Sequence, residues 1–193
     1  MRRDGSVHNN AAPSTPPEAG SKVIHVIQGD FAVTNDANAV MTTILGSCVA
    51  TCLFDPVVRV GGMNHFLLPG DVSKAGEMTF GVHAMELLIN ALLKKRADKY
   101  RLQAKLFGGA RMIQGLSDIG AKNARFAREF LERENIPCVG ESLGGTQARR
   151  IRFEPATGRA RQRVMGDAAA VPVAKPKPAP APVEETVSDV ELF

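Results

Sequence analysis

Cys48 and His65 are the two residues of this sequence whose types could do covalent chemistry together. A cysteine becomes a nucleophile when a neighbouring base or positive charge lowers its pKa from about 8.5, and an imidazole can be that base. Before the cysteine, Gly46 and Ser47 are small and leave backbone N–H groups free near the sulfur. Thr42 offers a hydroxyl that could orient the imidazole, as a third residue does in catalytic triads. The set Cys–His–Thr is therefore a candidate for acyl transfer through a thioester.

A β-hairpin would bring the cysteine and the histidine together without help from the rest of the fold. Segments 44–54 and 60–68 are apolar and rich in β-forming residues, and Asp55-Pro56 between them is a turn pair. With a four-residue loop, Phe54 pairs with Arg59 and the thiol lies directly opposite the imidazole. A change of register by one residue would place the two side chains on opposite faces. The predicted hairpin can therefore be checked at one pair of residues, Cys48 and His65.

The sequence around this pair resembles the CheD family, the chemoreceptor glutamine deamidases of bacterial chemotaxis. The first motif is LGSCVATCLFDP at 45–56, and the second is VGGMNHFLLP at 60–69. The resemblance covers residues 22–166. It continues through AMELLINALLKK at 84–95, AKLFGGARM at 104–112, IGAKNARFAREFL at 119–131 and GGTQARR at 144–150.

The resemblance implies that Cys48 is the nucleophile, His65 the base and Thr42 the third catalytic residue. It implies a hydrolase that converts glutamines of methyl-accepting chemoreceptors to glutamate, releases ammonia and needs no cofactor. The implied partners are the cytoplasmic helices of chemoreceptors and a phosphatase of the CheC type. The alternative is a non-catalytic adaptor that binds receptors or such a phosphatase. The same residues would also serve a deamidase acting on glutamines of another protein.

The order of predicted elements indicates an α+β fold. Short strands are expected at 23–27 and 31–33, before the hairpin. Apolar residues at helical spacing then predict helices over 80–96 and 118–134, with a strand at 102–106 between them. A strand at 136–141 and a second hairpin over 150–164 follow. We expect a layered α/β sandwich of mainly antiparallel sheets flanked by two helices. The family resemblance implies such a fold, shared in outline with toxin deamidases.

Composition separates one domain from two tails. Residues 1–21 are polar and rich in Pro, Ala and Ser, and we expect them to be disordered. Residues 22–166 form the predicted domain, and 167–193 read as a Pro/Ala-rich linker with an acidic end. The start has no apolar signal segment, and no apolar run is long enough to span a membrane. Three cysteines are too few for a disulfide framework, so a cytoplasmic location without membrane insertion is expected.

Other uses of the same residues are less well supported. Zinc could take Cys48, Cys52 and His65 as ligands, but the sequence offers no evident fourth ligand. Buried cysteines are usually inert, and Cys52 and Cys138 are expected to be structural. The arginines of 149–163 could form a basic face, and the net charge is +4. Only one Tyr and no Trp are available to stack on bases, so no nucleic-acid partner is expected.

Overall fold

The computed structural model describes residues 20–69, 73–112 and 118–166, which form twelve short elements. The predicted tails, 1–21 and 167–193, lie almost wholly outside these residues. The strands are β1 (Lys22–His25), β2 (Phe31–Thr34), β3 (Ala39–Leu45), β4 (Val49–Asp55), β5 (Val60–Phe66), β6 (Gln103–Gly108), β7 (Cys138–Leu143), β8 (Arg149–Glu154) and β9 (Arg159–Val164). The helices are α1 (Lys74–Lys94), the short 3-10 helix η1 (Lys99–Arg101) and α2 (Ile119–Arg133).

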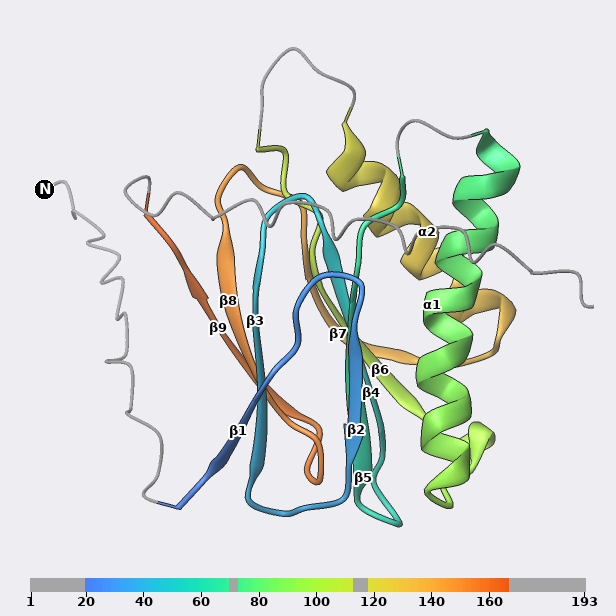
Figure 1. Cartoon of the computed structure of the whole chain (residues 1–193), viewed down its shortest axis with the longest axis vertical. Helices are drawn as coiled ribbons and strands as arrows, with labels where there is room; N and C mark the ends of the chain where they lie inside the picture. Colours follow the sequence, from blue (N-terminus) through green and yellow to red (C-terminus); the bar gives the residue numbers. More distant parts are fainter. Residues whose placement is uncertain (1–19, 70–72, 113–117, 167–193) are drawn as a thin grey trace, which may run out of the picture.

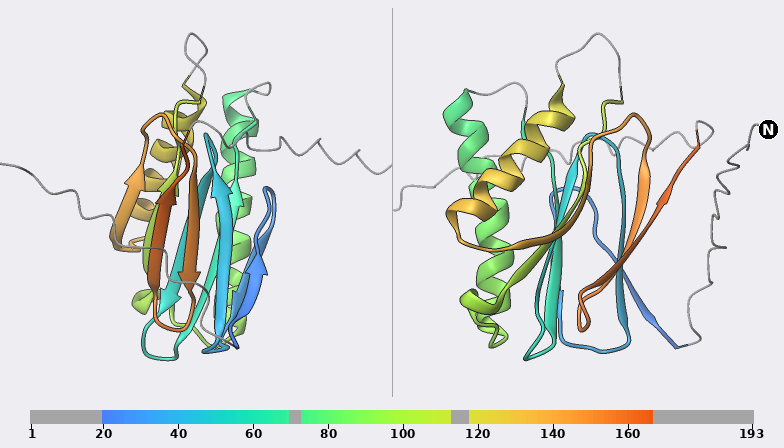
Figure 2. Two further views of the ribbon diagram at one scale, coloured as in Figure 1. Left: turned by 90° about the vertical axis from the view of Figure 1, so that its left-hand side faces the viewer. Right: turned by 180° about the vertical axis from the view of Figure 1, so that it is seen from behind.

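These elements pack in three layers: a four-stranded sheet, a five-stranded sheet and a pair of helices (Figure 1). The strand orders are β1-β3-β8-β9 and β2-β5-β4-β6-β7. Both helices cover the outer face of the five-stranded sheet, on the side away from the other sheet (Figure 2). Among the strands that the structure describes, the pairs β1/β3 and β6/β7 are parallel and the others antiparallel. The expected α+β sandwich of mainly antiparallel sheets is confirmed, with both helices on one side.

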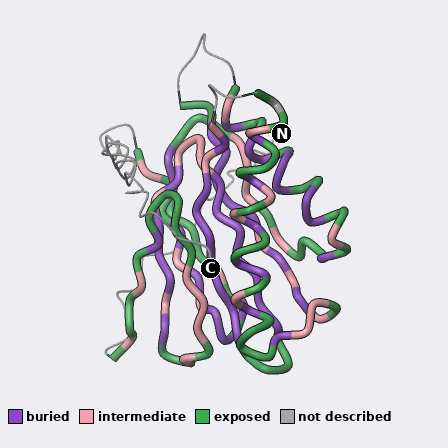
Figure 3. The backbone as a smooth tube through the Cα atoms, turned by 45° about the vertical axis from the view of Figure 1, so that its right-hand side comes forward, coloured by how far each residue is buried: buried purple, intermediate pink, exposed green. Residues whose placement is uncertain are grey.

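The central strands of the five-stranded sheet are buried on both faces. The outer face of the sheet and the helices share one apolar core, which includes Leu53, Leu88 and Phe130. The second core lies between the sheets and includes Met63 and Phe153. Every residue of β4 and β5 is buried as a result. Figure 3 shows the buried residues gathered in the middle of the molecule. Strands covered on both sides read as continuous apolar runs, which explains the pattern of the sequence here.

The hairpin of β4 and β5 exists, but its register differs from the expected one. Asp55 pairs with Val60, and His65 pairs with Ala50. The expected pairing of Phe54 with Arg59 is wrong because Arg59 adopts a φ of 54° in the turn and so does not join the ladder. The shift amounts to two residues, so each side chain keeps the face that the sequence predicted.

The expected strand over 44–54 is interrupted at the cysteine. β3 ends at Leu45 in one sheet and β4 begins at Val49 in the other, so residues 46–48 cross between the two sheets. Cys48 is therefore a loop residue and has no partner in the β4–β5 ladder. The small residues of Gly46-Ser47 allow this sharp crossing, and the sequence pattern alone did not reveal it.

The Gly61-Gly62 pair of the second motif is required by packing. A Cβ on Gly61 would collide with the backbone of Pro155 in the β8–β9 turn. A Cβ on Gly62 would lie 2.8 Å from Leu88 Cδ1 and 2.6 Å from the Ala32 carbonyl oxygen. These glycines let β5 approach the β8–β9 turn and helix α1 closely, so their first role is structural.

The remaining elements follow the predictions closely, with one difference at α1. Helix α2 begins where the sequence predicts it, with Asp118 as its cap: the Asp118 side chain accepts a hydrogen bond of 2.9 Å from Ala121 N. The hairpin of β8 and β9 is also confirmed. Helix α1 begins at Lys74, ahead of the expected start at residue 80, with Ser73 as its cap. Residues 70–72, just before this cap, lie outside the described residues. None of the described helices is both long and apolar enough to span a membrane.

Candidate active site

The loop that carries Cys48 is held by three hydrogen bonds to its carbonyl groups. Ala110 N donates to the Gly46 oxygen at 2.8 Å, and Gly109 N donates to the Cys48 oxygen at 2.7 Å. The side-chain amide of Asn123, on helix α2, donates to the Ser47 oxygen at 3.0 Å. Because every carbonyl from 46 to 48 is fixed, the peptide planes on both sides of the cysteine have a fixed orientation.

The end of β6 approaches this loop through two glycines. Gly108 has a φ of 108° and Gly109 a φ of 64°, a region that other residues rarely adopt. A Cβ on Gly108 would collide with the carbonyl oxygen of Cys48. These two glycines, which follow the predicted strand 102–106, therefore support the loop that carries Cys48, which the sequence did not indicate.

His65 lies in β5, where its side chain faces β3 of the other sheet. Its side chain is buried, with 6% exposed. The ring atom Nδ1 lies 2.9 Å from the hydroxyl of Thr43 and 3.4 Å from the carbonyl oxygen of Val26. A carbonyl can only accept, so this environment favours the tautomer in which Nδ1 carries the proton. The other ring atom, Nε2, is buried and has no hydrogen-bond partner among the described residues. Nε2 is then free to accept a proton.

The hydroxyl beside the imidazole belongs to Thr43, which corrects the expected contact of Thr42. The Thr42 hydroxyl donates to the carbonyl oxygen of Ile151 at 2.8 Å, within the four-stranded sheet. The two threonines are neighbours on β3, and successive side chains of a strand point to opposite faces. The catalytic role that the resemblance implies for Thr42 stays a prediction.

One tight turn contacts both Cys48 and His65. Residues 27–30 form the turn, closed by a hydrogen bond of 3.1 Å from Asp30 N to the Ile27 oxygen. Gly29 N donates to the His65 oxygen at 2.7 Å, and His65 N donates to the Asp30 oxygen at 3.0 Å. From the same turn, Gln28 Oε1 accepts a hydrogen bond of 3.1 Å from the Cys48 thiol. The turn therefore joins the nucleophile loop to the histidine strand.

Burial keeps both reacting groups neutral in the free protein. Burial raises the pKa of the Cys48 thiol to about 11, and the residue's own backbone N–H opposes this in part. Burial also lowers the pKa of His65, against the effect of the Val26 carbonyl. The thiol is therefore protonated at rest, and it donates to Gln28, with no hydrogen bond to His65 among the described contacts. Attack requires proton transfer when substrate arrives.

Of the two other cysteines, Cys52 has the structural place in the core that the sequence predicted, whereas the surface position of Cys138 does not bear out a structural role. Cys52 is fully buried in the core between the sheets, and burial raises its pKa. Cys138 is exposed at the start of β7. In the part of the chain that the structure describes, no group of His, Cys, Asp and Glu side chains could hold a metal ion. The zinc alternative has no support there.

Two cavities lie near this region, and neither contains the cysteine. A cavity of about 20 Å³ is lined by His65, Phe31 and Phe80, among others. A larger groove of about 450 Å³ lies between α2 and the ends of β6 and β7, lined by Arg111, Arg125 and further residues. The groove contains no candidate nucleophile, so we place the chemistry at Cys48 and His65, where the hydrogen bonds converge.

Sequence reasoning missed four residues of this site: Gln28, Thr43, Gly108 and Asn123. Their signals were weak, because a glutamine in a turn and an asparagine in a helix are ordinary in sequences. Only the fold brings them to the nucleophile loop and the histidine.

Comparisons with known proteins agree on one family. A model of the CheD chemotactic sensory transduction family matches residues 67–164. A "Probable chemoreceptor glutamine deamidase CheD" of Caulobacter vibrioides (strain NA1000 / CB15N) is 54% identical over 181 residues, which cover 92% of this chain and 96% of that protein. The protein of the same description from Agrobacterium fabrum is 50% identical over 179 residues, covering 91% and 99%.

Similarity to solved structures is low. The Neisseria meningitidis protein NMB0706 is 12% identical, with a TM-score of 0.41 over 65% of this chain and 63% of that chain, which is too low to carry a conclusion. The sequence relatives and the family model are sufficient, and by them this chain belongs to the CheD family.

Proposed function

We propose that this chain is a deamidase that converts glutamine side chains of chemoreceptors to glutamate and releases ammonia. The descriptions of its relatives support the substrate class. The observation that carries the chemistry is the turn 27–30, which binds the Cys48 thiol and both backbone groups of His65. That one turn links a half-buried thiol to the strand of an imidazole with a free Nε2 supports the proposal.

The reaction proceeds through a thioester on Cys48. His65 Nε2 takes the thiol proton as the sulfur attacks the carbon of the substrate amide. The tetrahedral intermediate collapses when His65 returns that proton to the leaving nitrogen, which departs as ammonia. Water then attacks the thioester, with His65 as the base again, and Cys48 leaves as the thiol. The receptor gains one carboxylate and therefore one negative charge at neutral pH.

The backbone N–H of Cys48 is suited to hold the oxyanion. This N–H lies close enough to the sulfur to oppose the rise in the thiol pKa. The carbonyl of the same peptide group, Ser47, accepts the hydrogen bond from Asn123. Such a bond fixes the peptide plane and polarises it, so the N–H becomes a stronger donor.

The substrate must present its glutamine on an exposed surface. The cavity beside His65, at about 20 Å³, has room for about one water molecule and none for a packed segment. Three apolar side chains around it are partly exposed: Phe31 at 38%, Phe80 at 43% and Leu87 at 38%. An exposed receptor helix with small apolar residues next to its glutamine would fit this surface.

Ammonia release from a purified cytoplasmic receptor fragment tests the proposal, together with the mass gain of one deamidation on the fragment. The intact chain should be active, and Cys48→Ala or His65→Ala should lower kcat by about 1,000-fold or more. Cys138→Ala is the matched control, because this cysteine is exposed and lies on β7. If the intact chain binds the fragment but releases no ammonia, the proposal fails, and an adaptor for receptors or for a CheC-type phosphatase takes its place.

A further inference from the structure

Gln28 contacts the nucleophile, yet the mechanism above gives it no task. Its Oε1 accepts a hydrogen bond of 3.1 Å from the Cys48 thiol, and among the described contacts it is the thiol's side-chain partner. The residue as a whole is exposed, and its carboxamide oxygen contacts the sulfur. A side chain in this place meets the reacting atoms directly.

The position of Gln28 is fixed by its turn. Gly29 follows with a φ of 89°, as expected for the third residue of a type II turn. The Asp30 N–H closes this turn on the Ile27 oxygen, and backbone hydrogen bonds at Gly29 and Asp30 attach the turn to His65. The backbone under the side chain is therefore held from both ends, which is the preorganisation that a catalytic group needs.

A carboxamide can serve a thiol and an anion in succession. It carries one acceptor oxygen and one NH₂ donor on the same planar group. The neutral thiol uses the oxygen, as the structure has it. Once the proton has moved to His65, the sulfur is an acceptor, and a rotation of the amide brings its N–H groups to face it. The oxyanion of the tetrahedral intermediate forms beside the sulfur and can accept the same donor.

We propose that Gln28 is a further catalytic residue, which accepts the thiol hydrogen at rest and donates to the thiolate and the oxyanion during the reaction. The inference rests on the proposed function, because it takes Cys48 as the nucleophile. No bond of Gln28 forms or breaks. Its second hydrogen-bond donor would complement the backbone N–H of Cys48 in holding the oxyanion.

A hydrogen-bond donor at this position would stabilise the Cys48 thiolate. Burial opposes formation of the Cys48 thiolate, and no lysine or arginine is hydrogen-bonded to this sulfur among the described contacts. A neutral donor can stabilise an anion without adding a second buried charge, which would itself need a partner. Gln28 supplies such a donor.

Kinetics and thiol chemistry of variants test the inference. Gln28→Ala should lower kcat by about 100-fold, the usual effect of losing one oxyanion donor, while KM changes little. Gln28→Glu should lower kcat further, because an isosteric carboxylate removes the donor and repels the thiolate. In both variants, alkylation of Cys48 by iodoacetamide, followed by peptide mass mapping, should shift to higher pH. Cys138 provides an internal reference in the same samples, since it is exposed and lies on β7.

Gln103→Glu is the matched control, since Gln103 pairs with Phe54 at the opposite end of the β4–β6 ladder. It should leave kcat and Cys48 alkylation as they are in the intact chain. Unchanged kcat and an unchanged alkylation profile in Gln28→Ala would overturn the inference. A second outcome would also overturn it: if Gln28 itself is deamidated in the intact chain but not in Cys48→Ala, then Gln28 is a substrate of the site. If Cys48→Ala itself stays active, the proposed function fails, and this outcome is separate from the others.

Discussion

The imidazole of His65 has one side-chain hydrogen-bond partner among the described residues, the Thr43 hydroxyl on the facing sheet, which accepts from Nδ1. This contact of 2.9 Å and the nearby Val26 carbonyl hold the ring with Nε2 free. Thr42, one residue earlier, is as deeply buried but binds a backbone carbonyl of β8. Of these two adjacent threonines, Thr43 therefore contacts His65 and Thr42 does not.

Replacing each threonine by valine separates these positions. Valine keeps the shape and β-branching and removes only the hydroxyl. Thr43→Val should lower kcat by roughly 10-fold or more, because the imidazole loses a partner that orients it. Thr42→Val should act chiefly on stability, by about 1 kcal/mol, because it breaks a hydrogen bond inside one sheet. Steady-state kinetics and thermal unfolding of both variants are the measurements. A larger loss of kcat in Thr42→Val would restore the role that the family resemblance implies for Thr42.

Helix α2 serves the site through one fully buried side chain. Asn123 Nδ2 donates to the Ser47 oxygen at 3.0 Å, and its Oδ1 accepts from Leu68 N at 2.8 Å. Leu68 follows the strand that carries His65, so a single amide joins the nucleophile loop and the chain beyond the histidine. Asn123 has no exposed surface and touches neither sulfur nor imidazole among its described hydrogen bonds. It is a positioning residue.

The two halves of this amide can be tested separately. Asn123→Asp keeps the acceptor for Leu68 N but removes the donor to Ser47, and Asn123→Ala removes both. Both variants should lose about 1–3 kcal/mol of stability, as expected for buried groups left unpaired. Their kcat should also fall more than KM rises, because the Cys48 N–H is no longer fixed. Kinetics at a temperature where each variant is folded by circular dichroism distinguish positioning from simple unfolding. Asn90→Ala, on the exposed side of α1, should change neither quantity.

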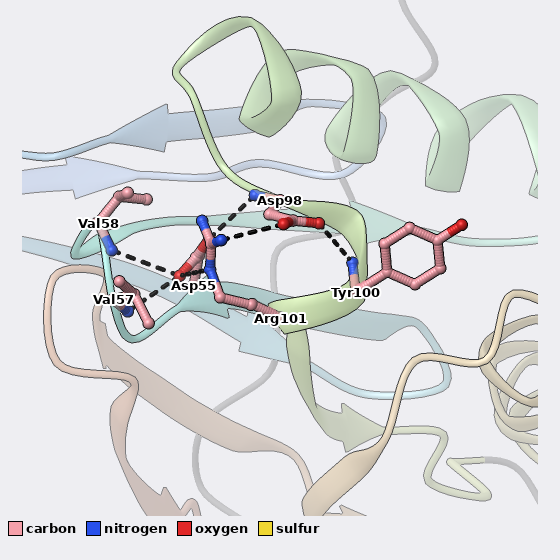
Figure 4. Close-up of polar contacts among 6 residues, drawn as sticks. All are labelled: Asp55, Val57, Val58, Asp98, Tyr100 and Arg101. Atoms are coloured by element: carbon pink, nitrogen blue, oxygen red, sulfur yellow. Dashed lines mark hydrogen bonds and ion pairs between the residues drawn. The ribbon is translucent and has the colours of Figure 1, made fainter.

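The molecule as a whole is also held by a carboxylate at the end of the sheet opposite Cys48. Asp55 has no exposed side-chain surface and forms an ion pair of 2.9 Å with Arg101 (Figure 4). It also accepts hydrogen bonds from the backbone N–H groups of Val57, Val58 and Asp98. Burial alone would raise the pKa of Asp55, but these hydrogen bonds together outweigh it and lower the pKa to about 2. The network ties the β4–β5 turn to η1.

Acid should therefore weaken the fold through Asp55. Its pKa is lower in the folded chain than the ordinary value of 3.8, so its stabilising effect is present above that value and is lost as the pH falls through about 2. At neutral pH, Asp55→Asn should lower the free energy of unfolding by up to about 2 kcal/mol. Urea unfolding at pH 7 and near pH 2.5 checks this, because the difference between variant and intact chain should shrink in acid. Glu134→Gln, which breaks a partly exposed ion pair with Lys99, is the control and should change little. An equal difference at both pH values would contradict the assignment.

Local patterns in the sequence predicted the elements and the faces of the fold well. The start of α2 near residue 118 and the hairpin of β8 and β9 depend on local signals, and both are confirmed. The register of the first hairpin was predicted wrongly, because it depends on the conformation of Arg59 in the turn. Arg59 has a positive φ, which cannot be recognised from the sequence at a residue other than glycine. The break before Cys48 was missed for a related reason, since apolar residues continue on both sides of it.

The contacts of the site were out of reach for a different reason. The hydrogen bonds from Gly109 and Asn123 to the cysteine loop join segments that are distant in the sequence. Spacing carries no information about such pairs. The choice between Thr42 and Thr43 depends on the pairing of β3 in its own sheet, which also lies beyond local patterns. The sequence therefore indicated candidate reacting residues, whereas the residues that support them could be found only in the fold.

The crossing of the chain from one sheet to the other at 46–48 has a consequence for how the protein loses activity on heating. Thr43 belongs to the four-stranded sheet and His65 to the five-stranded sheet, so their contact spans the seam of the sandwich. A slip of one sheet along the other by a single residue, about 3.3 Å, would break that contact while leaving both sheets paired. Each sheet can thus stay paired while the Thr43–His65 contact between the sheets is lost. The packing of the apolar layer between the sheets therefore determines whether the site stays aligned.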